Sequence, residues 1–360
     1  DALSRWRPVY LGAVKNDSVI AANSDVIAYP TGWRGRLAFG LLRVTGGSRH
    51  LRKLIFDAEP DLIHAHFGGD GWLVSRIAKK LGVPLVITLH GRDVTSQASG
   101  RGPLRARYRR NLRTAFARAS LLLAVSDAIR DRAIRLGADP AKVLVHYTGV
   151  PMPGPADHQD DGWDVIFVGR FVPKKGVDDL IEALGTLTDL RPRALFIGTG
   201  PLEAAAREQA AALGLDATFV GAQPPEVVAR YMTESKVFAS PSKTAPDGDA
   251  EGLPTTILEA ASMAVPTVST RHSGIAEAVR DGETGLLGGE GDRAALAANL
   301  RALLTDDGLR TRLGDAARRH VAEHFDVVRQ TRTLEDLFDA FAGAPGDSVA
   351  VGRSRSAGTA

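Results

Sequence analysis

Short apolar runs alternate with longer amphipathic stretches along the first half of the chain. Helical patterns occupy residues 71–81, 104–118 and 127–136. Residues 83–89 are almost continuously apolar, which is typical of a strand buried on both faces. This alternation predicts a parallel sheet with helices on both sides. The predicted strands of this half lie near 9–14, 60–67, 83–89, 121–125 and 143–145.

The alternation is interrupted once and then restarts. Pro151, Pro153 and Pro155 open an acidic stretch that ends at Asp164, a composition typical of linkers. Later apolar runs predict a second set of strands near 165–168, 194–197, 218–220, 237–239 and 267–269. We therefore predict the α/β class, with two doubly wound domains. The predicted parts are domains 1–152 and 164–322, a linker 153–163, a helix 323–341 packing back toward the first domain, and a disordered tail 342–360.

Composition narrows the class of protein. The 360 residues are 44% hydrophobic and 24% charged, the balance of an ordinary soluble protein. The chain has no cysteine, which excludes disulfides, thiolate nucleophiles and cysteine-ligated zinc sites. No apolar run approaches the ~18 residues that cross a bilayer, and residues 1–8 do not resemble a secretory signal. We expect a cytoplasmic protein.

Positive charge is concentrated in the first half. Residues 1–155 hold 24 Lys and Arg against 11 Asp and Glu, a charge of +13, whereas residues 156–360 hold 21 against 31, a charge of −10. Arginines between 101 and 118 surround an apolar stripe, and two interpretations stay open. Either this helix lies on the anionic inner face of the cell membrane, or the stripe faces the sheet and the arginines face water. The stripe consists of Leu104, Tyr108, Leu112 and Phe116.

Chemically active residue types follow the predicted strands. His90 follows a strand of the first domain, and Gly169-Arg170 follows a strand of the second. Ligands of open α/β sheets bind outside the carboxyl ends of the strands, so two such edges facing each other would form a cleft. The alternative is that the glycines and serines at these ends only form loops.

Two motifs of the second domain suit an anionic ligand. Arg170 and Lys175 stand in a loop before a predicted helix, where they could neutralise a diphosphate, although a solvated basic loop is the alternative. In the stretch 251–259, Gly252 permits close approach of the backbone, and Pro254 suits a first helical turn. The amides of Leu253, Thr255 and Thr256 would meet a phosphate, and a carboxylate within the helix would take two vicinal sugar hydroxyls. A surface pair of glutamates at a helix start is the alternative there.

In combination these motifs resemble a known family. Glu251 and Glu259, with seven residues between them, follow Ser240-Pro241-Ser242, Ile-Gly-Thr-Gly-Pro and Gly-Arg…Lys-Gly. This order resembles the retaining nucleotide-sugar glycosyltransferases of family 4, which have the GT-B fold. The segments 64–67 and 89–93 are similar to strand ends of the same family. The resemblance covers nearly all of residues 1–341 and is nearest to bacterial enzymes that build exopolysaccharide, lipopolysaccharide or glycolipid.

The resemblance implies a role for each site residue. Arg170 and Lys175 would hold the donor diphosphate, and Glu259 would bind the ribose hydroxyls. Glu251 and His90 are the implied catalytic residues: Glu251 would contact the transferred sugar, and His90 would position it from the opposite domain. For His90 the alternative is a histidine that only caps a strand end. The other implied donor-binding residues are Gly200, Gly221, Gly252, Leu253, Thr255 and Thr256.

The resemblance also implies a reaction without metal or cofactor. The leaving phosphate would help to deprotonate the acceptor on the same face of the sugar, and fixed positive groups would stabilise the charge. Asp247-Gly248-Asp249 matches the metal-binding motif of the other large glycosyltransferase fold. We expect no metal there, because hard cations need more oxygen ligands than this loop offers.

The partners expected from this resemblance are a UDP- or GDP-sugar and a glycan, lipid-linked or small-molecule acceptor, with peripheral membrane contact through the basic domain. Rival functions are a nucleotide-sugar epimerase or an inverting transferase, and a non-catalytic nucleotide-sugar-binding protein. Nucleic acid is not expected, since no DNA-binding module occurs.

The first predicted strand resembles the second strand of the family. We therefore expect that about 25–30 residues, which would form a first strand and helix, are missing. Their absence is expected to weaken acceptor binding.

Overall fold

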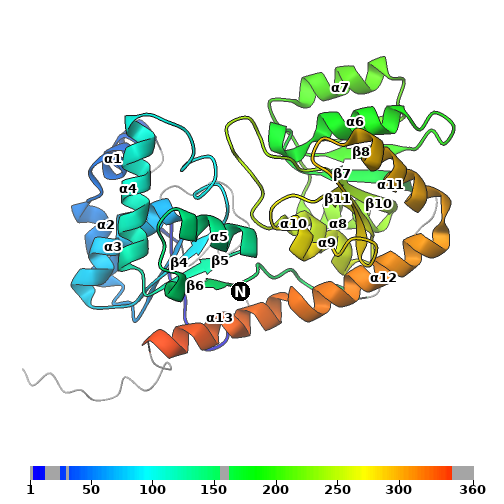
Figure 1. The fold of residues 1–360 in the computed structure, drawn as a ribbon. Coiled ribbons are helices and arrows are strands. Elements are labelled where there is room, and N and C mark those ends of the chain that lie inside the picture. The colour runs from blue at the N-terminus through cyan, green and yellow to red at the C-terminus, as the bar shows by residue number, and fades with distance from the viewer. Residues whose placement is uncertain (1–2, 13–24, 30–31, 155–161, 343–360) are drawn as a thin grey trace, which may run out of the picture.

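The computed structural model contains two α/β units that lie side by side (Figure 1). It describes residues 3–12, 25–29, 32–154 and 162–342. Two long helices at the C-terminal end run along both units (Figure 1). The middle of the predicted linker and the predicted tail beyond residue 342 lie outside the described residues.

The N-terminal unit is built on a parallel sheet with the strand order β3-β4-β5-β6, and β1 and β2 form a separate parallel pair. Strand β4 is buried along its whole length, in agreement with its apolar sequence. The strands are β1 (Tyr10–Gly12), β2 (Asp25–Ile27), β3 (Ile63–His66), β4 (Leu85–Leu89), β5 (Leu121–Ala124) and β6 (Val143–Val145). The helices are α1 (Trp33–Thr45), α2 (Arg49–Asp57), α3 (Gly68–Leu81), α4 (Pro103–Arg118) and α5 (Asp127–Arg135), followed by the short helix η1 (Pro140–Lys142).

The C-terminal unit has a six-stranded parallel sheet with the order β12-β11-β10-β7-β8-β9. The direction of winding reverses between the neighbours β7 and β10, and such a switch point is where doubly wound sheets bind ligands. The strands are β7 (Trp163–Val168), β8 (Ala194–Ile197), β9 (Ala217–Phe219), β10 (Ser235–Ser240), β11 (Thr267–Thr270) and β12 (Gly285–Gly288). The helices are η2 (Pro173–Lys175), α6 (Val177–Gly185), α7 (Glu203–Ala212), α8 (Pro225–Thr233), α9 (Thr255–Ser262), α10 (Ile275–Ala278) and α11 (Arg293–Thr305).

The last two helices, α12 (Asp307–His324) and α13 (Val327–Ala342), tie the units together. Helix α13 packs on the N-terminal unit, where the ring of Phe338 contacts that of His64. The buried carboxylate of Glu335 accepts hydrogen bonds from the backbone N–H groups of Ser4 (2.7 Å) and Arg5 (2.6 Å). The chain therefore begins and ends its described part on the same face of the N-terminal unit.

Helix α4 resolves one of the alternatives left open by the sequence. Leu112 and Phe116 are buried against the sheet, so this part of the apolar stripe faces the core, whereas Leu104 at the helix start is 78% exposed. Several arginines donate to backbone carbonyls instead of lying free in water; Arg113, for example, donates to Leu136 at 3.0 Å. Helix α4 therefore buries one face in the core of the N-terminal unit, and its first turn presents an apolar side chain to solvent.

Candidate functional site

The loop between β7 and α6 is folded tightly by a glycine and the short helix η2. At Gly176 the backbone is left-handed (φ 62°), and an added Cβ would overlap the carbonyl oxygen of Pro241. This turn directs Lys174 and Lys175 toward residues 249–251. Arg170 is exposed, and its guanidinium has no partner among the described residues. Arg170 is therefore available to an anionic ligand.

Charged side chains form a buried cluster where this loop meets the loop before α9. Lys175 Nζ lies 2.9 Å from Glu251 Oε1, and Lys174 Nζ lies 3.2 Å from Asp249 Oδ2. Ser242 Oγ donates to Glu251 Oε1 at 3.3 Å. Burial, with only 6% of Glu251 exposed, acts to raise the pKa of this carboxyl, but the charges of Lys175 and Lys174 outweigh burial and lower it. Glu251 is therefore a carboxylate at neutral pH.

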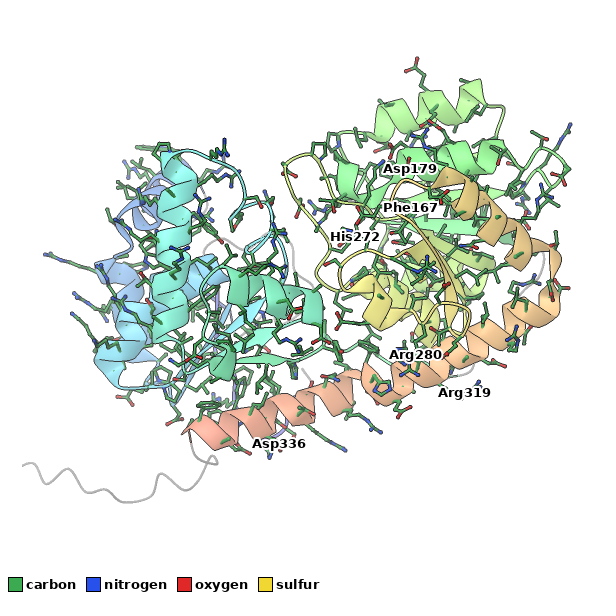
Figure 2. The ribbon with its side chains drawn as sticks, in the orientation of Figure 1. Phe167, Asp179, His272, Arg280, Arg319 and Asp336 are labelled. Atoms are coloured by element: carbon green, nitrogen blue, oxygen red, sulfur yellow. The ribbon has the colours of Figure 1, made fainter. Side chains whose placement is uncertain are left out.

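His272 and Glu290 hold the backbone of Glu251 in place. Nε2 of the buried His272 ring accepts the N–H of Glu251 at 3.1 Å, and Nδ1 lies 2.6 Å from Glu290 Oε1. Because Nε2 accepts, the ring proton resides on Nδ1, which donates to the carboxylate. Glu290 also accepts the N–H of Thr244 at 2.7 Å. Figure 2 shows His272 on the side of the C-terminal unit that faces the N-terminal unit. Sequence reasoning missed this pair, because neither residue belongs to a motif.

The start of α9 offers unpaired hydrogen-bond donors. Pro254 is the N-cap residue, and the N–H groups of Leu253, Thr255 and Thr256 have no hydrogen-bond partner among the described residues. The hydroxyl of Thr256 is also buried without a partner. Free amides at the positive end of a helix dipole favour an anion.

Glu259 lies in α9 beyond these amides and is partly buried. Burial raises its pKa, and a hydrogen bond from Thr255 opposes that shift. No ion pair of Glu259 occurs in the described ranges, in contrast to Glu251. Its oxygens therefore remain available to neutral donors such as hydroxyl groups.

Gly200 and Gly221 lie differently with respect to this site. An added Cβ at Gly200 would lie 2.8 Å from the backbone nitrogen of Phe171, so Gly200 packs against the loop that carries Arg170. Gly221 accepts the N–H of Gly198 at 2.8 Å and borders open space. Their role in donor binding stays a prediction.

His90 directly follows the carboxyl end of β4, in the N-terminal unit. Its Nε2 lies 2.9 Å from His66 Nδ1, and its ring centroid lies 4.7 Å from that of Phe67. Burial, and secondarily the neighbouring His66, lowers the pKa of His90 to about 4. His90 is thus a neutral hydrogen-bonding ring at pH 7. The buried Asp93 fixes its loop by accepting the N–H of Gly91 at 3.0 Å.

The two units touch where the His90 loop meets the Glu251 loop. An added Cβ at Gly252 would overlap the carbonyl oxygen of His90, so the backbones are in direct contact. Ser126 Oγ donates to the carbonyl of Gly252 at 3.0 Å, and Thr95 Oγ1 donates to Asp249 Oδ1 at 3.2 Å. The fold therefore brings the two implied catalytic loops together across the junction of the units.

Comparison with known proteins identifies the family. The sequence pattern described as Glycosyltransferase Family 4 matches residues 9–152, and that described as Glycosyl transferases group 1 matches residues 153–320. The amylovoran biosynthesis glycosyltransferase AmsK of Erwinia amylovora is 31% identical over 294 residues, which cover 78% of this chain and 70% of AmsK. The chain belongs to glycosyltransferase family 4. A D-inositol 3-phosphate glycosyltransferase of Streptomyces coelicolor is 30% identical over 325 residues, covering 78% of this chain and 69% of that protein.

Solved structures show that this family 4 glycosyltransferase has the GT-B fold, as predicted. HepE of Anabaena, in complex with UDP-glucose, aligns with a TM-score of 0.69 at 22% identity, covering 88% of this chain and 86% of HepE. Sucrose-phosphate synthase of Thermosynechococcus elongatus aligns with a TM-score of 0.71 at 20% identity, covering 84% and 80%. The predictions of the family, the fold and a transferase enzyme are therefore confirmed. Within the described ranges, no helix of the glycosyltransferase has both the length and the apolar character to span a membrane.

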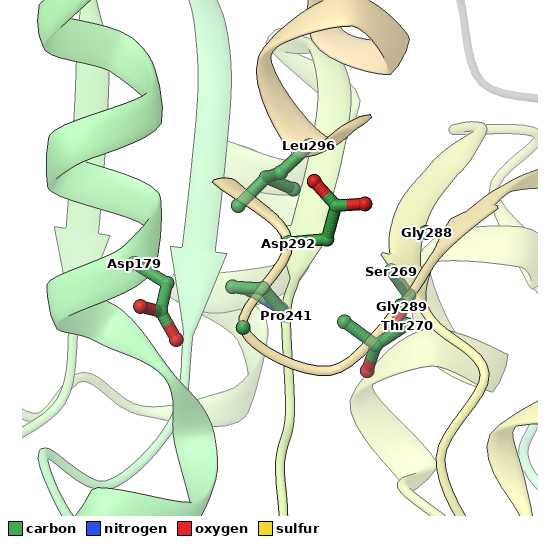
Figure 3. A pocket seen from close by; sticks show the side chains of 9 residues that line it. Asp179, Pro241, Ser269, Thr270, Gly288, Gly289, Asp292 and Leu296 are labelled. Carbon is green, nitrogen blue, oxygen red and sulfur yellow. The ribbon is translucent and has the colours of Figure 1, made fainter. Parts of the chain in front are cut away.

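In the described residues of the glycosyltransferase there is no metal cluster beside the site, and the hollow shown in Figure 3 lies apart from it. Across the part of the chain that the structure describes, no cluster of three or more His, Cys, Asp or Glu side chains is suited to a metal. A shallow hollow, too small to enclose a water molecule, lies between α6 and the loop after β12 (Figure 3). The predicted donor-binding and catalytic residues do not line it, and Asp179 at its wall is already bound by Lys243 (2.6 Å) and Arg293 (2.7 Å). The hollow is therefore not part of the site.

Proposed function

We propose that this glycosyltransferase moves a hexosyl group, with retention of configuration, from a UDP- or GDP-sugar to a glycan, lipid-linked or small-molecule acceptor. The observation that carries the proposal is the buried carboxylate of Glu251. It is held by Lys174 and Lys175 beside the free donors at the start of α9, and the neutral His90 lies across the junction. That HepE was solved with UDP-glucose supports a nucleotide-sugar donor.

In the proposed reaction, Arg170, Lys175 and the amides at the start of α9 hold the donor diphosphate. These fixed positive groups stabilise the charge that grows on the diphosphate as its bond to the sugar breaks. A phosphate oxygen takes the proton of the acceptor hydroxyl, and the acceptor oxygen bonds to the sugar on the same face. Glu259 receives the ribose hydroxyls, and Glu251 and His90 orient the transferred sugar.

The proposed setting is the cytoplasm, with the acceptor entering from the His90 side of the junction. The rival functions differ in their products. An epimerase would return a free nucleotide sugar of altered configuration, and a non-catalytic binder would release no nucleoside diphosphate. Incubation with a panel of UDP- and GDP-sugars, followed by chromatography of the nucleotides, distinguishes these functions from transfer or slow donor hydrolysis.

Replacement of Arg170 by alanine should weaken nucleoside diphosphate binding about 10- to 100-fold, because a charge-assisted hydrogen bond contributes ~1.5–3 kcal/mol. Calorimetry with UDP and GDP measures this loss. Arg312→Ala is a matched control, since Arg312 is an exposed arginine of α12 away from the site. Equal affinity of the Arg170 variant and the unmodified chain would contradict the proposed diphosphate site.

Transfer or donor hydrolysis should continue in excess EDTA at an unchanged rate. The motif Asp247-Gly248-Asp249 does not present two free carboxylates, because Asp249 is bonded to Lys174 and Thr95. The positive side chains and amides would take over the stabilising role of a cation. The rate of nucleoside diphosphate release, measured with EDTA and again after adding Mg²⁺ or Mn²⁺, checks this expectation. A rate that falls in EDTA and recovers with Mn²⁺ would overturn the metal-free mechanism.

A further inference from the structure

Three histidines form a row near the carboxyl ends of β3 and β4. His64 and His66 lie two residues apart on β3, so their side chains share one face of the sheet. His64 Nε2 lies 2.7 Å from Thr88 Oγ1 of the neighbouring strand, and the His64 ring centroid lies 4.6 Å from that of His66. On its other side His66 contacts His90. The ring of His66 therefore lies between two other histidines, although its side chain reaches solvent.

The contact between His66 and His90 is an in-plane hydrogen bond. Nδ1 of His66 lies 2.9 Å from Nε2 of His90, and the planes of the two rings are inclined by only 24°. The ring centroids are 5.1 Å apart, which nearly equals the N···N distance plus the two ring radii. Both nitrogens therefore lie close to the line between the rings, where the N–H of one ring points at the lone pair of the other.

Both rings are neutral at pH 7. The surrounding protein desolvates them, which lowers the pKa of His66 and, with a smaller contribution from His66 itself, lowers the pKa of His90 to about 4. A neutral imidazole has one N–H and one lone pair. The bond between the rings uses one of each, so one of the two outer nitrogens donates and the other accepts. These outer nitrogens, His66 Nε2 and His90 Nδ1, have no hydrogen-bond partner among the described residues.

We propose that His66 is a positioning residue for His90, which it holds in place and in one tautomer. The tautomer of a histidine is set by the hydrogen bond that its other nitrogen makes. The pair then offers one donor and one acceptor, which suits the hydroxyl groups of a sugar, since a hydroxyl can both donate and accept. The inference rests on the proposed role of His90 in orienting the transferred sugar, and it extends that role to a residue of the neighbouring strand.

The test measures turnover as release of nucleoside diphosphate, with the donor that the panel of UDP- and GDP-sugars identifies. His66→Phe keeps a ring beside His64 but removes the partner of His90 Nε2. We expect turnover to fall by about tenfold or more, because this nitrogen is left unpaired. His66→Asn places an amide group near the former Nδ1 and should restore most of the turnover. Calorimetry should show unchanged affinity of both variants for free UDP or GDP, since the proposed nucleotide ligands belong to the C-terminal unit.

His50→Phe is the matched control, because His50 is an exposed histidine of α2 in the same unit. It should leave turnover unchanged, and circular dichroism with thermal unfolding verifies that every variant is folded. Equal losses of turnover in His66→Phe and His66→Asn would make His66 a packing residue and overturn the inference.

The variant His90→Phe separates this inference from the proposed function. If His90→Phe lowers turnover but His66→Phe does not, the positioning role of His66 is wrong, while the proposed function stands. If neither variant lowers turnover, the proposed role of His90 fails as well. Comparable losses in both, with rescue by His66→Asn, would support the pair as one hydrogen-bonding unit.

Discussion

Replacement of Glu251 by glutamine should lower the turnover of sugar transfer or donor hydrolysis by about 10²–10³-fold, with little loss of affinity for the free nucleoside diphosphate. The carboxylate is buried and ionised, and its proposed contact is the transferred sugar. Glutamine keeps the size of the side chain and can still accept from Ser242, so the change is chiefly one of charge. It also frees Lys175 from its 2.9 Å ion pair, which leaves this lysine more available to the diphosphate.

Glu259→Gln is the matched comparison, and it should have the opposite effect. Its proposed contact is the ribose, so it should weaken the free nucleotide and the donor together, by about tenfold or more. Calorimetry with the nucleoside diphosphate and steady-state release of that product from the donor separate binding from turnover for both variants. If the two variants reduce nucleotide affinity equally, the roles assigned to the two glutamates are wrong.

The apolar pattern was sufficient to predict most strands of both sheets. It failed for β2 and β12, which are short and whose strand character depends on pairing. In β12 two leucines stand between glycines, and the strand exists because it pairs with β11 in parallel register. An edge strand of this kind has too little apolar sequence of its own to be recognised.

The boundary between α12 and α13 also could not be predicted from a local sequence pattern. A single helix was predicted over 323–341, but residues 323–324 belong to α12, and α13 starts at Val327. The break is made by Val150, whose N–H donates to the carbonyl of Phe325 (2.8 Å) and whose carbonyl accepts the N–H of Val327 (3.0 Å). A contact so distant in sequence leaves no local pattern.

In the site, motif spacing identified the loops but not the pairing within them. Arg170 and Glu251 were predicted from the order and spacing of their motifs, and their roles stay predictions. No motif indicated that Lys174 Nζ lies 3.2 Å from Asp249 Oδ2, a carboxylate of the apparent metal motif. The support of Glu251 by His272 joins residues from two separate loops, so only the folded chain shows it.

The second large mutational effect is expected at the junction between the two units. Gly252→Ala should reduce turnover by about 10²-fold, because a misplacement of ~1 Å between reacting groups has effects of this size. The added Cβ would overlap the carbonyl oxygen of His90 and lie 3.1 Å from Val125 Cγ2. Since the obstacle is backbone, no side-chain rotation relieves it, and the His90 loop must move away from the Glu251 loop. The fold of each unit should remain, because the contact lies between them.

Gly289→Ala is the control for this effect. It lies in the same unit, and its added Cβ would meet only Asp292 Cβ at 3.6 Å, an ordinary contact. It should leave turnover and thermal unfolding unchanged. For Gly252→Ala, steady-state release of nucleoside diphosphate should show the loss of turnover. Calorimetry with the free nucleotide then separates two causes: displacement of the His90 loop alone leaves this affinity nearly normal, whereas displacement of the neighbouring Leu253 amide lowers it. Should the nucleotide affinity fall as steeply as the turnover, Gly252 would act through the amides at the start of α9, and the proposed role of the junction in placing His90 against the sugar would be wrong.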